Sequence, residues 1–166
     1  MKYHAKIRAS ALIIEDEQIL LVEFNDETGL HYNLPGGTIE PDESIIEGLK
    51  REVKEETNAD IQPGDLVFAL EYEPVRNQYW AGPVRSLSLI FGGKIAGGSI
   101  PQLSDRPDEN QTAVKWIELS RLADIELLPH LAGEIIAYAQ QQSVARIFRE
   151  EPLKPEKALA YLNQNC

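Results

Sequence analysis

Residues 34–59 read LPGGTIEPDESIIEGLKREVKEETNA, and this stretch decides the fold. It opens with a turn at 34–37, where two glycines after a proline let the backbone take positive φ and approach a ligand closely. Ser44 and Glu47 follow with the spacing of a helix capping box. The stretch therefore predicts a turn beside phosphate or metal, followed by a helix.

A helical wheel at 100° per residue gives this helix a buried stripe with an acidic edge beside it. The stripe consists of Ile45, Ile46, Leu49 and Val53, and the acidic edge of Glu52, Glu55 and Glu56. The wheel places no cation among the three carboxylates, because Lys50 and Lys54 fall on the far side. Gly48 lies one turn earlier, and its missing side chain predicts room for a bound ion.

The acidic edge predicts a divalent metal site. Like charges four residues apart, as in Glu52 and Glu56, oppose helix formation by a few tenths of a kcal/mol. They also raise one of the two pKa values unless a cation lies between them. The stretch offers oxygen ligands without His or Cys, which favours Mg²⁺ or Mn²⁺ over Zn²⁺. The alternative is a solvated helix face in a chain with 27 acidic residues.

From Gly37 to Ala59 the spacing of residues resembles the signature of the Nudix hydrolases. The chain has Gly37, five spacers, Glu43, seven spacers, Arg51-Glu52-Val53, a spacer and Glu55-Glu56. At ordinary residue frequencies these six Gly, Glu and Arg positions coincide at about one start in a million. Asn58 and Ala59 differ from the family's usual glycine and bulky apolar residue. Asn is the next-best left-handed helix cap, so we expect the geometry to persist.

The resemblance implies a metal-dependent hydrolase that cleaves the diphosphate bond of a nucleoside diphosphate linked to another moiety. It implies an ion pair between Arg51 and Glu43 that orients the glutamates. The implied metal ligands are the main-chain carbonyl of Gly37 and the side chains of Glu52, Glu55 and Glu56, and the implied cofactor is Mg²⁺ or Mn²⁺.

The general base has two alternative positions in this resemblance. It lies within the signature, at Glu52 or Glu56, or on a later loop, for which Glu109 is the candidate. A solvated loop acid is the alternative for Glu109.

Substrate contacts are expected from Arg8 and from the two glycines. Arg8 lies in a predicted strand at 5–14, where a cation near the strand end can meet phosphate. A surface ion pair is an equal alternative for Arg8. Gly36 and Gly37 bring backbone atoms close to the ligand.

Composition bounds the partners. At 166 residues with 43% hydrophobic content, the chain predicts one domain with a sizeable core. A net charge of -11 argues against duplex nucleic acid and anionic membranes as partners. The sequence shows neither a signal peptide nor a run of 18 apolar residues, which predicts a cytoplasmic protein. The single cysteine, Cys166, allows no internal disulfide.

The order of predicted elements is that of the Nudix α/β/α sandwich, an α/β (α+β) fold with a mixed β-sheet. Strands are predicted at 5–14, 18–24, 31–34, 65–71, 85–95 and 112–117, and helices after Ser44, at 119–122 and at 129–142. We expect a hydrolase domain at 1–142 and a tail at 143–166. A short helix at 156–164 covers either this domain or a neighbouring subunit of a homodimer.

The substrate prediction depends on Pro74, fifteen residues after Ala59, a placement resembling that in Nudix enzymes acting on ADP-ribose. Tyr79 and Trp80, in the loop at 75–83, are candidates to stack on a base or to anchor the loop. One alternative is a nucleoside triphosphate pyrophosphohydrolase. Another is a non-catalytic nucleotide-binding regulator, disfavoured because all three carboxylates are present. An isopentenyl-diphosphate isomerase is disfavoured because the chain lacks a mid-chain cysteine.

Overall fold

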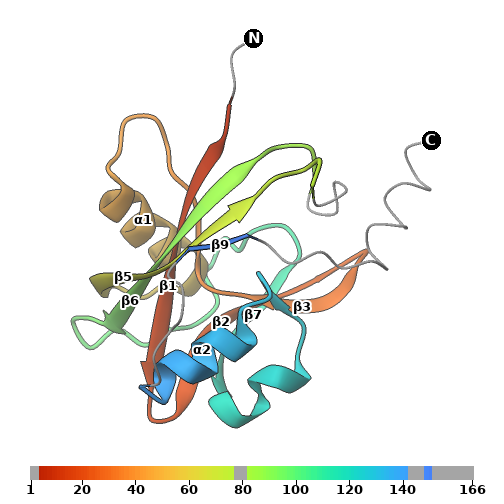
Figure 1. The fold of residues 1–166 in the computed structure, drawn as a ribbon. Coiled ribbons are helices and arrows are strands. Elements are labelled where there is room, and N and C mark those ends of the chain that lie inside the picture. The colour runs from red at the N-terminus through yellow and green to blue at the C-terminus, as the bar shows by residue number, and fades with distance from the viewer. Residues whose placement is uncertain (1–3, 77–81, 142–147, 151–166) are drawn as a thin grey trace.

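The computed structural model describes residues 4–76, 82–141 and the backbone of 148–150 (Figure 1). The strands are β1 (Lys6–Glu15), β2 (Gln18–Asp26), β3 (Gly29–Asn33), β4 (Gly36–Thr38), β5 (Ile61–Tyr72), β6 (Ser86–Ile95), β7 (Gln111–Glu118), β8 (Leu127–Leu128) and β9 (Phe148–Glu150). The helices are α1 (Ile45–Thr57), the 3-10 helix η1 (Leu119–Asp124) and α2 (Ala132–Ala139). Tyr79, Trp80 and the predicted helix at 156–164 lie outside the described residues.

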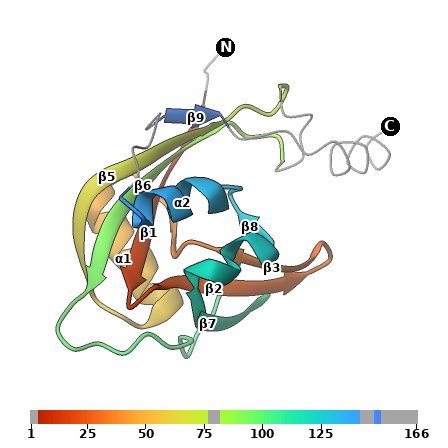
Figure 2. The same cartoon turned by 60° about the horizontal axis from the view of Figure 1, so that its bottom comes forward.

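The sheet is mixed, as the sequence predicts, and β1 lies at its centre. The main strand order is β8-β3-β2-β1-β6-β5-β9, with β4 paired to β1 and β7 paired to β2. β1 is parallel to β6 and antiparallel to β2 and β4. Figure 2 shows α1 on one side of β1 and β6, with α2 on the other. The predicted α/β sandwich is therefore confirmed.

Alternation along β1 explains why both faces of the sheet are covered. Ala9, Ala11 and Ile13 are fully buried in the cluster that contains Leu49 and Val53 of α1. On the other face, Leu12 belongs to the cluster beneath α2, which includes Leu131 and Ile135. Fully burying a Leu, Ile or Val side chain contributes about 1.5–3 kcal/mol. These contacts fix α1 against the centre of the sheet.

Both predicted ends of α1 are confirmed. Ser44 Oγ accepts from the Glu47 N–H at 3.3 Å, and Glu47 Oε2 accepts from the Ser44 N–H at 2.8 Å. Asn58 has a left-handed φ of 53°, and its N–H donates to the Lys54 carbonyl at 2.9 Å. Asn thus replaces the family's usual glycine without changing the cap.

Some expectations about the elements are wrong in detail. Ile45 and Ile46 are 36% and 37% exposed, because the core beneath α1 begins one turn later, at Leu49. Residues 36–38 form β4 where a turn was expected. β5 begins at Ile61 and not at Asp65, and α2 is shorter than 129–142. The two-residue strand β8 and the strand β9 were not predicted, because such short segments carry no periodic pattern.

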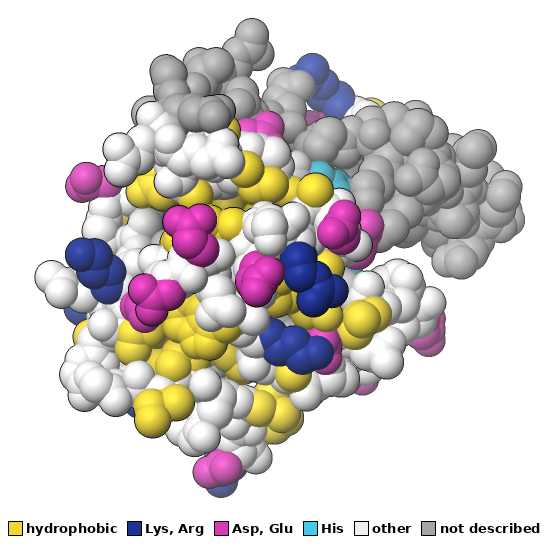
Figure 3. Space-filling model, turned by 90° about the horizontal axis from the view of Figure 1, so that it is seen from below, with side chains coloured by type: hydrophobic (Ala, Val, Ile, Leu, Met, Phe, Trp, Pro, Cys, Tyr) yellow, Lys and Arg dark blue, Asp and Glu magenta, His cyan; other side chains and the backbone are white. Residues whose placement is uncertain are grey.

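The surface mixes side-chain types. Figure 3 shows acidic groups dispersed among hydrophobic and basic ones on one face. No helix in the described part of the chain is long and apolar enough to cross a membrane.

Candidate active site

The two glycines at the start of the signature are required by close packing. Gly36 has a φ of +144°, and a Cβ there would overlap the Ala9 carbonyl oxygen of β1. Gly37 does not have positive φ. The predicted positive φ is therefore confirmed for Gly36 and wrong for Gly37. A Cβ on Gly37 would instead overlap the carboxylate of Glu52. β4 therefore lies directly against β1 and against the acidic edge of α1.

Glu56 is the most buried carboxyl group of the acidic edge, with 6% of its surface exposed. Its Oε2 accepts from the Gly36 N–H at 2.7 Å. Burial raises the pKa of Glu56 to about 8, and the nearby charges of Asp108 and Glu52 add to the rise. Burial likewise raises the pKa of Glu52. Burial therefore favours the neutral form of both carboxyl groups more strongly than the nearby arginines favour the ionised form.

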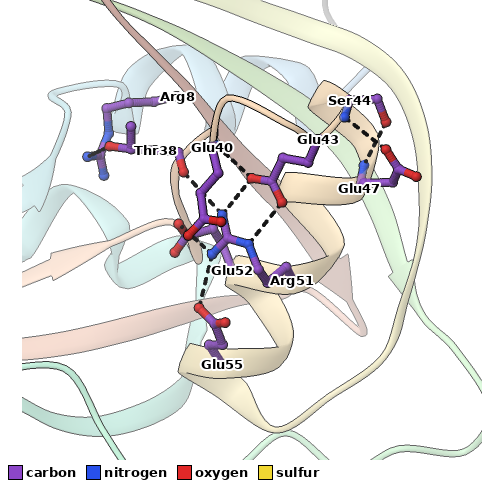
Figure 4. Close-up of polar contacts among 9 residues, drawn as sticks. All are labelled: Arg8, Thr38, Glu40, Glu43, Ser44, Glu47, Arg51, Glu52 and Glu55. Atoms are coloured by element: carbon purple, nitrogen blue, oxygen red, sulfur yellow. Dashed lines mark hydrogen bonds and ion pairs between the residues drawn. The ribbon is translucent and has the colours of Figure 1, made fainter.

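Arg51 connects most of the remaining polar groups (Figure 4). Its Nε and Nη2 donate to the two carboxylate oxygens of Glu43 at 2.9 and 2.6 Å. Nη2 also donates to the Thr38 carbonyl at 3.2 Å. The ion pair with Glu43 that the resemblance implies is therefore present. These hydrogen bonds from Arg51 lower the pKa of Glu43 to about 2.

The expectation that no cation lies among the three carboxylates is wrong. Arg51 Nη1 lies 3.0 Å from Glu52 Oε1 and 3.1 Å from Glu55 Oε2. Only Lys50 and Lys54 were considered as cations on this helix. Arg51 precedes Glu55 by one helical turn, and side chains at this spacing meet. Glu55 is exposed, so its pairing with Arg51 is open to solvent.

The space beside Gly48, which was expected to hold a bound ion, is filled by protein side chains. A Cβ on Gly48 would lie 2.5 Å from Glu43 Oε1 and 2.7 Å from Ile39 Cδ1. Glycine therefore lets the Glu43 carboxylate approach the helix and reach Arg51. The space is occupied by a protein carboxylate and does not accommodate an ion.

Arg8 joins the acidic edge to a pocket of about 370 Å³. Its Nη1 donates to Thr38 Oγ1 at 3.4 Å, and its charge acts on both Glu52 and Glu56. The pocket is also lined by Lys6, Asn33, Leu34, Tyr72 and Ile90. Asn33 Oδ1 is buried from solvent and has no hydrogen-bond partner among the described residues. Sequence reasoning missed Asn33, because its place beside Arg8 results from the pairing of distant strands.

The loop before β7 carries Glu109, the candidate base. Glu109 is exposed, and the acid on this loop that acts on Glu56 is its neighbour Asp108. Gln111, at the start of β7, donates through Nε2 to the Glu56 carbonyl at 2.8 Å. No motif in the sequence identifies Asp108 or Gln111.

A family model described as the NUDIX domain matches residues 5–139. The chain belongs to the Nudix family. Enzymes of this family act on phosphoanhydride bonds and typically use a divalent metal ion.

Curated relatives of this Nudix chain are longer than it is. The chain is 39% identical over 143 residues to 8-oxo-dGDP phosphatase NUDT18 of Homo sapiens. This alignment covers 82% of this chain and 40% of the relative. It is 29% identical over 145 residues to NAD-capped RNA hydrolase NudC of Stutzerimonas stutzeri, covering 87% of this chain and 46% of the relative. The chain thus spans less than half the length of these two relatives.

Solved structures share the Nudix fold. A NUDIX hydrolase from Nitrosomonas europaea has a TM-score of 0.67 and 25% identity, with 84% of this chain and 91% of that chain covered. An ADP-ribose pyrophosphatase from Streptococcus suis has a TM-score of 0.61 and 22% identity, with 89% and 99% covered. At this identity the second comparison shows the fold alone.

The acidic edge of this Nudix domain fits a hard divalent cation by its donor chemistry. Glu52, Glu55 and Glu56 offer oxygen atoms, the ligands that such cations prefer. As the side chains lie, no three His, Cys, Asp or Glu groups among the described residues converge to hold a metal. To join such a site, Glu55 would turn from Arg51, which its exposed side chain permits.

Gly37→Ala tests the packing of β4 against the acidic edge. The added Cβ displaces the flexible end of Glu52 and no backbone atom, so we expect turnover to fall about tenfold with little change in melting temperature. The control is Gly133→Ala in α2, where a Cβ meets nothing within 4 Å and helix propensity improves. Steady-state kinetics and thermal melting are compared for both variants. A loss of turnover equal to that of Gly133→Ala would contradict this role of Gly37.

Proposed function

We propose that this chain is a divalent-metal-dependent hydrolase that cleaves the diphosphate bond of a nucleoside diphosphate linked to another moiety. The observation that carries the proposal is the pocket that begins at Arg8, beside the acidic edge, and extends to Asn33. Its volume of about 370 Å³ falls within the roughly 300–1,000 Å³ typical of small-molecule sites. A substrate can therefore place phosphate at Arg8 and its nucleoside in the pocket.

Each residue of the site has a separate proposed role in hydrolysis. Glu52, Glu55, Glu56 and the Gly37 carbonyl are the proposed cation ligands. When bound, a divalent cation neutralises phosphate charge, stabilises the leaving oxygen and lowers the pKa of water. Arg8 adds positive charge on the pocket side, and Arg51 with Glu43 orients the glutamates. The proton acceptor is Glu52, Glu56 or Glu109.

Pocket chemistry favours a nucleoside as the group bound beyond the phosphates. Leu34, Leu70 and Ile90 form apolar walls suited to a base or sugar. Arg8 and Asn33 add polar side chains to the same lining, of the kind that orient a bound ligand.

Two substrate classes follow from different observations. ADP-ribose is the first, because Pro74 lies fifteen residues after Ala59, a placement that resembles that in Nudix enzymes acting on ADP-ribose, and two residues after Tyr72, which lines the pocket. A purine nucleoside di- or triphosphate is the second, because two of the relatives are 8-oxo-dGDP phosphatases at 32% and 39% identity.

A substrate panel tests the proposed function. ADP-ribose, other nucleotide sugars, dinucleoside polyphosphates, 8-oxo-dGDP, NAD-capped RNA and nucleoside triphosphates are incubated with the protein and Mg²⁺, and products are resolved by chromatography. We expect AMP and ribose phosphate from ADP-ribose at a kcat/KM far above that for any triphosphate. Preference for a nucleoside di- or triphosphate would replace ADP-ribose with the second class. Binding without hydrolysis of any compound would identify a regulator and overturn the proposal.

Millimolar Mg²⁺ or Mn²⁺ is expected to raise the melting temperature. A ligand that binds only the folded state stabilises it by mass action, by about 2.7 kcal/mol at a hundred times its Kd. Thermal melting is measured in MgCl₂ and in NaCl at matched ionic strength. Equal shifts in both salts would show charge screening and contradict a specific cation site.

A further inference from the structure

The last turn of α1 obtains hydrogen bonds from the segment that follows β6. The final carbonyls of a helix have no partners within the helix. The Thr57 carbonyl accepts from the Gln102 N–H at 2.9 Å, and the Glu56 carbonyl accepts from Gln111 Nε2 at 2.8 Å. Residues 103–110, here called the acidic loop, lie between these two contacts and carry Asp105, Asp108 and Glu109. The acidic loop is therefore held to the end of α1 at both of its ends.

Gln111 makes its contact from a buried position, with 6% of its surface exposed. Its Oε1 accepts from the Asp108 N–H at 3.2 Å, while its own N–H donates to the Asp108 carbonyl at 3.0 Å. The side-chain amide thus uses its donor end on α1 and its acceptor end on the acidic loop. One side chain joins the residue that carries the buried carboxyl group, Glu56, to the backbone of Asp108.

The acidic loop adds the negative charge of Asp108 to the surroundings of Glu56. The negative charge of Asp108 contributes to the raised pKa of Glu56, after the larger effect of burial, although the two residues are far apart in sequence. Asp108 is exposed and lies on a loop, so its distance from Glu56 depends on what holds that loop. The hydrogen bonds of the Gln111 side chain with backbone groups of Asp108 and Glu56 provide this restraint.

We propose that Gln111 is a positioning residue, which clamps the acidic loop to the last turn of α1 and thereby holds the backbone of Asp108 at the end of the helix that carries Glu56. Its kinetic consequence rests on the proposed hydrolase function, whereas the clamp itself does not. Gln111→Met keeps the length of the side chain and removes both of its hydrogen bonds. Gln102→Ala is the matched control, because its contact with Thr57 uses the backbone N–H and is retained.

Amide hydrogen exchange of the full chain tests the clamp. In Gln111→Met we expect faster exchange, by about tenfold, within 103–110 and in the last turn of α1, with unchanged exchange in β1 and β6. Gln102→Ala should match the parent. Exchange in 103–110 equal to that of the parent would overturn the clamp, and so would a uniform rise across all strands, which indicates general destabilisation.

A double-mutant cycle that combines Gln111→Met with Asp108→Asn tests whether Gln111 affects turnover through Asp108. Asp108→Asn keeps the backbone contacts of Gln111, so it is expected to fold even if Gln111→Met is unstable. At saturating Mg²⁺ we expect each single variant to lower kcat about fivefold with KM within twofold, and the double variant to lose no more than the larger single loss. Losses that multiply, or an unchanged kcat in Asp108→Asn, would overturn the action through Asp108. An inactive parent would overturn the proposed function, and exchange alone would then decide the clamp.

Discussion

Glu52→Gln and Glu56→Gln are each expected to lower turnover by at least about a hundredfold while the protein stays folded. Each variant removes one negative charge from the proposed cation site and keeps the size of the side chain. The fold survives Glu56→Gln because the amide oxygen can still accept from the Gly36 N–H, which lies 2.7 Å from the carboxylate. Turnover is measured under saturating substrate and Mg²⁺, with circular dichroism as the check on folding.

Lys50→Gln is the matched control for these two variants. Lys50 is exposed on the same helix and also changes by one charge. Its removal should leave turnover within about twofold of the parent. If Glu52→Gln and Glu56→Gln retained the activity of Lys50→Gln, the acidic edge would not be the site of the chemistry.

Arg51→Met has the second largest expected effect, a loss of turnover of about ten- to a hundredfold. The guanidinium contacts Glu43, Glu52 and Glu55 and the Thr38 carbonyl. Without it, Glu43 keeps only the hydrogen bond from the Glu40 N–H, and the contacts that join α1 to the Thr38 carbonyl and to Glu43 are lost. We therefore expect a lower melting temperature together with the lower turnover.

Lys54→Met is the control for the loss of a cation from α1. Lys54 makes an exposed ion pair with Asp60 at 3.1 Å, and such pairs contribute about 0–1 kcal/mol. Its turnover should equal that of the parent. Retention of full turnover by Arg51→Met at a temperature where it is folded would show that Arg51 serves stability alone.

Local patterns predicted the helix that carries the carboxylates. The Ser44–Glu47 capping box and the left-handed Asn58 cap are determined by neighbouring residues, so the sequence contains the information. The strand at 5–14, which is β1, was predicted for the same reason, since side chains on a strand alternate. The signature predicted the contact of Arg51 with Glu43 from a family resemblance.

Contacts between distant segments were not predictable. A wheel gives the direction of a side chain but not what lies opposite, so Ile45 and Ile46 were expected in the core and are partly exposed. Gly37 is required by Glu52 across the gap between β4 and α1. The position of Asn33 beside Arg8 depends on how β1 and β3 are placed in the sheet.

The later loop illustrates the same limit. It carries the adjacent acids Asp108 and Glu109, and nothing in the sequence distinguishes them. The hydrogen bonds of Gln111 to the Asp108 backbone and to the Glu56 carbonyl hold this loop at the end of α1, and they join segments far apart in the sequence. The role of Glu109 as a base stays a prediction, as does the domain boundary at residue 142.

The most direct test of the central claim is the rate of diphosphate cleavage in ADP-ribose and 8-oxo-dGDP with chelator, and again after Mg²⁺ is restored. We expect no measurable cleavage with chelator and full recovery with Mg²⁺, because Glu52, Glu55 and Glu56 need a cation to act on phosphate. Cleavage at the same rate with and without chelator, or no cleavage of any compound of the substrate panel with Mg²⁺, would contradict the claim that this acidic edge is the catalytic site of a metal-dependent hydrolase.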